Sequence, residues 1–270
     1  MTTAEYGGEP AMRAEHYVQS LERGLAVIRA FSAETPSMTL SDVARSTGLT
    51  RAATRRFLLT LVDLGYVRTD GRQFALTPRV LELGYAYLSS AELPEVVQPH
   101  LERLAAEVGE SSSVSVIDGD DIVYVARVPT SRIMAVSISV GTRFPAYLTS
   151  MGRVLLAALP SEELEHYLAG LELRTATPYT VSSTQLLRAE IDRARSQGWA
   201  IVDQELEEGL RSVAAPIRDR EGTVVAAANV SAHATRTSVE DIRRELLPPL
   251  LATVARIEAD LEIANGSTRV

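Results

Sequence analysis

The stretch that decides the fold runs from Thr39 to Leu76 and reads TLSDVARSTGLTRAATRRFLLTLVDLGYVRTDGRQFAL. A short helix opens with its first four residues, Gly48 suits the left-handed turn that follows, and Thr50 is a good N-cap for a second helix. The Asp70-Gly71 pair between two short apolar runs is a strong β-hairpin signal. Helix, turn, helix and hairpin in this order predict a winged helix-turn-helix, whose second helix enters the major groove of DNA.

The second helix of this stretch has two different faces. An apolar stripe at helical spacing indicates the core side: Thr54, Phe57, Leu58, Leu61 and Leu64. The other side carries arginines beside small residues, so the helix can approach a groove floor while guanidinium groups contact phosphate or fork onto guanine. We therefore expect groove contacts and phosphate contacts from two sets of residues: Arg51, Ala52, Ala53, Arg55 and Arg56 on the helix, and Arg68 and Arg72 in the wing.

Charge is distributed unevenly along the chain. The 270 residues carry a net charge of −8, and all 27 basic residues are arginine. Between Met38 and Pro78, however, there are six arginines against three aspartates. A basic segment in an acidic chain is typical of a local DNA-binding module; an ordinary solvated helix face is the plainer alternative.

Composition excludes several classes of protein. The absence of cysteine removes disulfides, thiolate metal sites and cysteine nucleophiles. No apolar run reaches the ~18 residues of a membrane span, and the N-terminus has no signal-peptide pattern. We expect a soluble cytoplasmic protein without membrane association.

The chain length suggests two domains. Residues 1–15 are rich in Gly, Glu and Ala and are expected to be disordered, and 16–77 form the winged helix-turn-helix. Pro78 opens a linker helix over 78–92, whose aromatic residues indicate either subunit packing or an ordinary core face. A second domain then covers 93–264 and a tail covers 265–270.

The second domain alternates helices with two groups of three strands. Strands are expected at 112–117, 122–128, 133–138, 199–202, 212–217 and 224–231, and helices at 97–108, 162–168 and 184–196. Ser150 is expected to cap a further short apolar helix, and Pro248-Pro249 to break or kink the last one. Because hairpins link the strands, the fold class is α+β with a mostly antiparallel sheet, as in a small-molecule sensor.

Catalytic motifs are lacking. The four histidines are scattered without an i, i+4 pair, and no nucleophile elbow, Walker loop or G-x-G-x-x-G occurs. The carboxylate run Asp203, Glu205, Glu207 and Glu208 is compatible with a divalent cation, although a solvated loop face is the better interpretation. We expect no catalytic residue, no bound metal and no cofactor.

A ligand pocket is better supported. The helix that starts at Ser150 presents the amides of Met151 and Gly152, and helix N-termini attract carboxylates. Asn229 and Ser231 share one face of a strand and can point into a cavity, which Asp203 can join. Strand-end capping is an equally open alternative. Three arginines can pair with an anionic ligand: Arg127, Arg132 and Arg143.

Several motifs together resemble the IclR-type transcriptional regulators. They are SLERGLAVIRAF, LSDVARSTGLTRAATRRFLLTLVDLGYV, FALTPRVLELGYAYL, SMGRVLLAAL, GWAIVDQELEEGLRSVAAPI and AANVSA, spread over residues 17–262. The pieces TRAATRRFLLTLVDLGYV, RVLELGYAYLSS, ESSSVSVIDGDDIVYVARVP and AYLTSMGRVLLA look closest to the subgroup of the protocatechuate and p-hydroxybenzoate pathways.

The resemblance implies a winged helix-turn-helix, a linker helix and an α/β effector-binding domain. It also implies dimers or tetramers on palindromic operators in double-stranded DNA, and small carboxylate effectors, here an aromatic acid or 3-oxoadipate. Carried over by position, the effector contacts fall on Met151, Gly152, Asp203, Val213, Asn229 and Ser231. Val213 and Asn229 stand where members that bind small oxo-acids often have Cys and Ser, which argues against a glyoxylate-like effector.

Our hypothesis is a regulator of aromatic-acid catabolism of the β-ketoadipate type. Two rivals remain open. One is a constitutive DNA-binding protein whose second domain only forms oligomers, and the other is a hydrolase or metal enzyme with its site in the 199–231 region.

Overall fold

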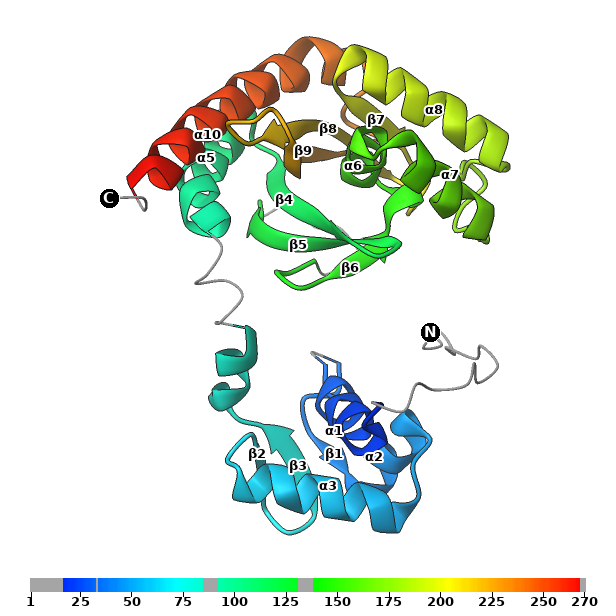
Figure 1. Cartoon of the computed structure of the whole chain (residues 1–270), viewed down its shortest axis with the longest axis vertical. Helices are drawn as coiled ribbons and strands as arrows, with labels where there is room; N and C mark the ends of the chain where they lie inside the picture. The colour runs from blue at the N-terminus through cyan, green and yellow to red at the C-terminus, as the bar shows by residue number, and fades with distance from the viewer. Residues whose placement is uncertain (1–16, 33, 85–91, 131–137, 268–270) are drawn as a thin grey trace. The chain divides into compact units, whose positions relative to one another are not determined.

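The computed structural model describes residues 17–32, 34–84, 92–130 and 138–267, in two compact units that divide near residue 87 (Figure 1). The smaller unit contains α1 (Gln19–Arg29), α2 (Leu40–Thr47), α3 (Arg51–Asp63), β1 (Met38–Thr39), β2 (Val67–Thr69) and β3 (Gln73–Leu76). Its strands form an antiparallel sheet in the order β1-β3-β2. The expected winged helix-turn-helix is therefore confirmed.

Local hydrogen bonds fix the helix-turn-helix. Thr39 and Asp42 form a reciprocal capping box at the start of α2, and Gly48 ends this helix with a φ of 66°. The Thr50 side chain then accepts from the amide of Ala53 and caps α3. These signals act over three residues or fewer, which is why they are legible in the sequence.

The core of the smaller unit contains only part of the expected stripe. Thr54, Leu58 and Leu61 are buried, and Phe57 is half-buried. Leu64 is 51% exposed, so its assignment to the core was wrong. It is the C-cap of α3, beyond the last turn that packs on the core.

The linker begins with a 3-10 turn, η1 (Pro78–Val80), which Thr77 caps, and helical residues continue to 84. Leu81 and Leu83 are exposed there. The rest of the expected linker helix lies mostly outside the described residues, as does most of the expected strand at 133–138.

The larger unit is built on a six-stranded sheet in the order β6-β5-β4-β9-β8-β7, with every described pairing antiparallel. The strands are β4 (Ser111–Asp118), β5 (Asp121–Val128), β6 (Arg143–Pro145), β7 (Ala200–Asp203), β8 (Leu210–Arg218) and β9 (Val224–His233). The helical elements are α5 (Glu92–Val108), η2 (Ala146–Leu148), α6 (Ser150–Ala158), α7 (Ser161–Gly170), α8 (Thr184–Gln197), α9 (Val239–Asp241), η3 (Ile242–Leu246) and α10 (Leu247–Ser267).

The sheet separates two hydrophobic cores. Helices α5 and α10 cover one face, and α6, α7 and α8 cover the other (Figure 1). Adjacent residues of β8 alternate between them, since Val213 packs with the first pair and Ala214 with the second group. The expected α+β class and antiparallel sheet are confirmed.

The double proline does not end the last helix. Pro248 and Pro249 lie in the first turn of α10, directly after the π-helical segment Ile242–Leu246. Helical backbone continues through both elements, and the missing proline N–H groups fall at the start of α10. The expectation of a break is therefore wrong, although the regular α-helical pattern does change at this point.

Candidate functional site

The smaller unit presents an arginine surface on α3 and the wing. Arg51, Arg55 and Arg56 are exposed, whereas Thr54, Leu58 and Leu61 of the same helix are buried. Ala52 is also exposed and Ala53 is half-buried, so the side chains beside the arginines are small and project little from the helix. Arg68 on β2 and Arg72 in the following turn are exposed as well.

The charges of this surface are largely uncompensated. Within the described ranges, Arg55, Arg56, Arg68 and Arg72 take part in no ion pair, and Arg51 donates to the Ser41 hydroxyl at 2.7 Å. Asp70 lies in the wing, where the amides of Gln73 and Arg72 hold the pKa of its carboxyl below its usual value. Free guanidinium groups that point away from the core can bind DNA phosphates and base edges.

The larger unit holds a small closed cavity at the start of α6. It is lined by Tyr124, Ile138, Leu148, Thr149, Ser150, Val202, Leu206, Leu210, Ser212, Asn229 and Ser231. Its volume is about 20 Å³. This is room for about one water molecule, so an organic ligand enters only if a wall moves.

Asn229 carries an unpartnered atom in this cavity. Its amide nitrogen donates to the Ser231 hydroxyl at 3.0 Å, while its buried Oδ1 has no partner among the described residues. The hydroxyls of Ser150 and Ser212 lie 2.9 Å apart on the same lining. Buried polar atoms are normally hydrogen-bonded, so the free oxygen marks a place for a ligand or a water molecule.

Arg127 lies on the same face of the sheet as Asn229 but is not among the residues that line the cavity. It pairs across the sheet with Ser113, which in turn pairs with Asn229. Its Nη1 donates to the Ser113 hydroxyl at 3.1 Å, while its buried Nε has no partner in the described chain. Burial lowers the pKa of this guanidinium and raises the pKa of the nearby Tyr124 to about 12. A cationic donor beside a neutral phenol suits a carboxylate ligand.

Met151 and Gly152 are not among the residues that line this cavity. Thr149, not Ser150, caps α6, and its hydroxyl accepts from the Gly152 amide at 2.9 Å. A Cβ on Gly152 would lie 2.0 Å from the carbonyl oxygen of Ala146, so the glycine admits the backbone of η2 rather than a ligand. The Met151 side chain is fully buried and its sulfur accepts from the Ser115 hydroxyl.

Three other expected contact residues also lie elsewhere. Asp203 is held by Arg211 through two hydrogen bonds of 2.7 and 2.8 Å, which satisfies its charge. Val213 packs in the core under α5 and α10, on the opposite sheet face from Ser212. Arg143 pairs with Asp118 and Asp121 near the β4–β5 turn. Arg132 lies outside the described residues.

Asn229 and Ser231 line the cavity as strand alternation suggested, whereas Arg127 does not line it. Sequence reasoning missed Tyr124, Thr149, Ser150 and Ser212. The signal for Ser212 was its pairing opposite Ser231, which requires the register of β8 on β9.

A buried ion pair, also missed, positions one wall. Arg153, 2% exposed, donates to Glu205 at 2.6 Å, and the same carboxylate oxygen accepts from the amide of Val181. Glu205 belongs to the β7–β8 loop, whose Leu206 lines the cavity. Glu205 and Asp203 are both paired with arginine, and the described residues contain no group of three or more His, Asp or Glu side chains that could hold a metal ion.

Comparison with known proteins identifies the family. The family model described as Bacterial transcriptional regulator IclR C-terminal matches residues 85–259, and the IclR helix-turn-helix domain matches residues 20–71. The chain belongs to the IclR family. The Pca regulon regulatory protein of Pseudomonas putida is 46% identical over 237 residues, covering 87% of this chain and 81% of that protein.

Solved structures of similar proteins share the fold. A transcriptional regulator from Rhodococcus sp. RHA1 is 60% identical, with a TM-score of 0.82 over 91% of this chain and 98% of that one. An IclR homologue from Microbacterium hydrocarbonoxydans, crystallised with 4-hydroxybenzoate, is 26% identical, with a TM-score of 0.79 over 90% and 98%. Among the described residues of this IclR-family chain, no helix is long and apolar enough to cross a membrane.

Proposed function

We propose that this IclR-family protein is a transcriptional regulator of aromatic-acid catabolism that binds operator DNA and responds to a small carboxylate. The observation that carries the proposal is the exposed and unpaired arginine surface of α3 in a chain of net charge −8. The Pca regulon regulator of Pseudomonas putida supports the pathway class. The protein acts in the cytoplasm, where bacterial DNA lies.

Two copies of the chain place their α3 helices in successive major grooves of a palindromic operator. Arg51, Ala52, Ala53, Arg55 and Arg56 face the groove, while Arg68 and Arg72 contact phosphates. Fluorescence anisotropy with DNA from the protein's own promoter region tests this, using Arg55→Gln/Arg56→Gln with Arg220→Gln as an exposed control. Operator affinity that is equal in the double variant and the wild type contradicts the assignment.

The effector enters the cavity at the start of α6. Arg127 receives the carboxylate, and Asn229 and Ser231 bind a second polar group such as a ring hydroxyl. An aromatic acid fits this chemistry, and 3-oxoadipate is the aliphatic alternative. Because the cavity holds only about 20 Å³, binding displaces a wall, and effector affinity for the open form biases the arrangement of subunits in the dimer or tetramer.

The small cavity volume favours one rival, a constitutive DNA-binding protein whose larger unit only forms oligomers. A thermal-shift screen with p-hydroxybenzoate, protocatechuate and 3-oxoadipate separates the two proposals. A true effector raises the melting temperature by mass action, and does so less in Asn229→Ala. The same melting temperature with and without all three acids favours the rival.

A further inference from the structure

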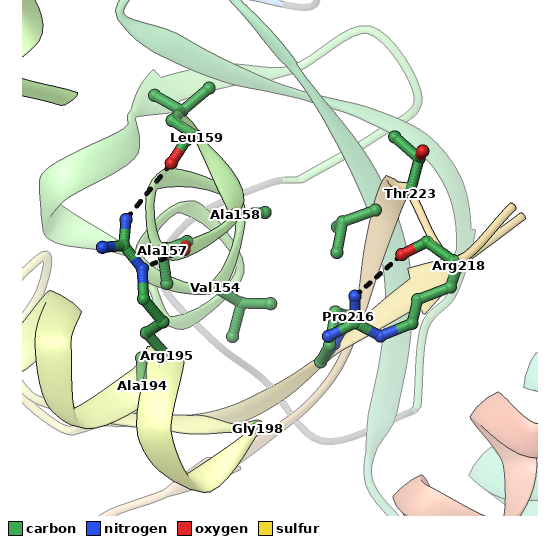
Figure 2. Close-up of a pocket in the computed structure, with 12 residues that line it drawn as sticks. Val154, Ala157, Ala158, Leu159, Ala194, Arg195, Gly198, Pro216, Arg218 and Thr223 are labelled. Atoms are coloured by element: carbon green, nitrogen blue, oxygen red, sulfur yellow. Dashed lines mark hydrogen bonds between the residues drawn. The ribbon is translucent and has the colours of Figure 1, made fainter. Parts of the chain in front are cut away.

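A second and larger pocket lies at the other end of α6 (Figure 2). Its volume is about 440 Å³, within the range of roughly 300–1,000 Å³ typical of small-molecule sites. Helix α6 ends there with Ala157 and Ala158, whereas its first residue, Ser150, lines the closed cavity. The two pockets share no lining residue in the described chain, so they are separate sites.

The wall of this pocket combines an apolar surface with two cations. Val154, Ala157, Ala158, Ala194 and Val224 supply apolar atoms. Arg195 from α8 and Arg218 from the end of β8 lie on opposite sides of them (Figure 2). Among the described residues that line it, none is acidic.

Both arginines are oriented by backbone carbonyls. Arg195 donates Nε to Ala157 at 2.7 Å and Nη2 to Leu159 at 3.2 Å, and Arg218 donates Nη1 to Gly222 at 3.0 Å. Each guanidinium has five N–H donors, so at least three remain on Arg195 and four on Arg218. These hydrogen bonds therefore orient both guanidinium groups and leave most of their N–H donors available for a ligand.

Neither guanidinium has an acidic side-chain partner within the described ranges, although the backbone amide of Arg218 donates to the Glu258 carboxylate at 2.8 Å. Arg174, Arg220 and Arg256 likewise form no ion pair among the described residues. Other arginines of the larger unit are paired with carboxylates: Arg143, Arg153, Arg188, Arg193, Arg211, Arg236, Arg243 and Arg244. Capping of the last α6 carbonyls explains the position of Arg195. It does not explain Arg218 on the facing wall.

We propose that this pocket is a second ligand site, which binds an organic dicarboxylate. A guanidinium fork matches one carboxylate, and two forks on facing walls match a carboxylate at each end of the ligand. The apolar residues between them contact a hydrocarbon middle, which selects against inorganic anions. The proposal is independent of the effector cavity, because no residue of that cavity takes part.

Isothermal titration calorimetry of the full chain with adipate tests the site, with hexanoate as a monocarboxylate of the same chain length. Removing one arginine or one carboxylate loses charge-assisted hydrogen bonds, so Arg218→Gln, or hexanoate in place of adipate, weakens binding at least about tenfold. Arg220→Gln, an exposed arginine on the same hairpin, binds adipate as the wild type does. Ala158→Glu places a carboxylate in the pocket from an exposed position and abolishes binding.

Three results overturn the proposal: no heat of adipate binding, equal affinity in Arg218→Gln, or equal affinity for hexanoate. Adipate binding that is lost in Asn229→Ala also overturns it, because the ligand then occupies the closed cavity. The proposed function fails by a different result: p-hydroxybenzoate and protocatechuate cause no response, and any response to 3-oxoadipate is unchanged in Asn229→Ala, in a protein that still binds adipate.

Discussion

The arginine surface of the smaller unit and the buried Arg153 of the larger unit use the same side chain in opposite ways. On α3 and the wing, Arg55, Arg56, Arg68 and Arg72 are exposed and form no ion pair within the described residues. In the larger unit, Arg153 is 2% exposed and paired with Glu205. An exposed cation keeps its hydration until a polyanion displaces it, whereas a buried cation needs its partner in the folded state. Binding is therefore expected to depend on the first set and stability on the second.

The largest expected effect comes from breaking the buried pair. Arg153→Met leaves the Glu205 carboxylate without its cation and destabilises the fold by about 3–5 kcal/mol, measured by urea unfolding. Arg153→Met/Glu205→Gln removes both charges and recovers part of that loss. Arg193→Gln breaks an exposed pair with Glu190 and changes stability by less than about 1 kcal/mol. Equal losses for the buried and exposed pairs contradict the comparison.

Gly152→Ala comes next. Its Cβ would lie 2.0 Å from the Ala146 carbonyl oxygen, so α6 and η2 must move apart, at a cost of about 1–3 kcal/mol or more. Gly170→Ala at the end of α7 is the matched control, because its Cβ meets no described atom within 4 Å. Thermal unfolding of both variants checks this. An unchanged melting temperature for Gly152→Ala shows that this glycine does not serve the packing.

Substitutions in the arginine surface are expected to weaken DNA binding without lowering the stability of the fold. Arg55→Gln weakens operator binding by about 1–3 kcal/mol if Arg55 contacts a base. Arg68→Gln weakens binding to all sequences and lowers the slope of log affinity on log salt by about 1, as expected for a phosphate contact. Both variants unfold at the temperature of the wild type. A fall in that temperature indicates that the surface contributes to the fold.

The smallest expected effect concerns Glu207 in the β7–β8 loop, where burial raises the pKa of the carboxyl above its ordinary value of 4.5, against an opposing effect of His233. Below about pH 4.5 the carboxyl is protonated in both folded and unfolded chains, and Glu207→Gln matches the wild type. As pH rises through the raised pKa, the wild type buries a charge and loses stability relative to the variant. Unfolding of the wild type and of Glu207→Gln at pH 4 and pH 7 measures the difference, and an equal difference between the two proteins at both pH values contradicts the prediction.

Strand alternation predicted part of the cavity correctly. Asn229 and Ser231 are two residues apart on β9 and both line it. Asp203 and Val213 were assigned to the same cavity but belong to β7 and β8, where they face the other way. A shift of one residue in register reverses every side chain of a strand, and no local feature of the sequence specifies that register.

The starts of the helices also differ in how much the sequence alone could predict. Thr39, together with Asp42, caps α2 and Thr50 caps α3, and both caps are visible within one turn of sequence. At α6 the sequence suggested Ser150, but Thr149 is the cap, and the reason for Gly152 is a contact with η2. Capping chemistry is local, whereas the role of a buried glycine depends on what packs against it.

By itself the sequence determined the winged helix-turn-helix and its arginine face, because caps, a left-handed glycine and an Asp-Gly turn act over a few residues and the helical period sorts the side chains. Only the tertiary structure decided which polar groups share a cavity. Ser212 and Ser231 line one cavity through the pairing of β8 with β9, and Arg195 and Arg218 lie on facing walls of the pocket at the end of α6. Such contacts join residues far apart in the chain, and their geometry is set by packing and register.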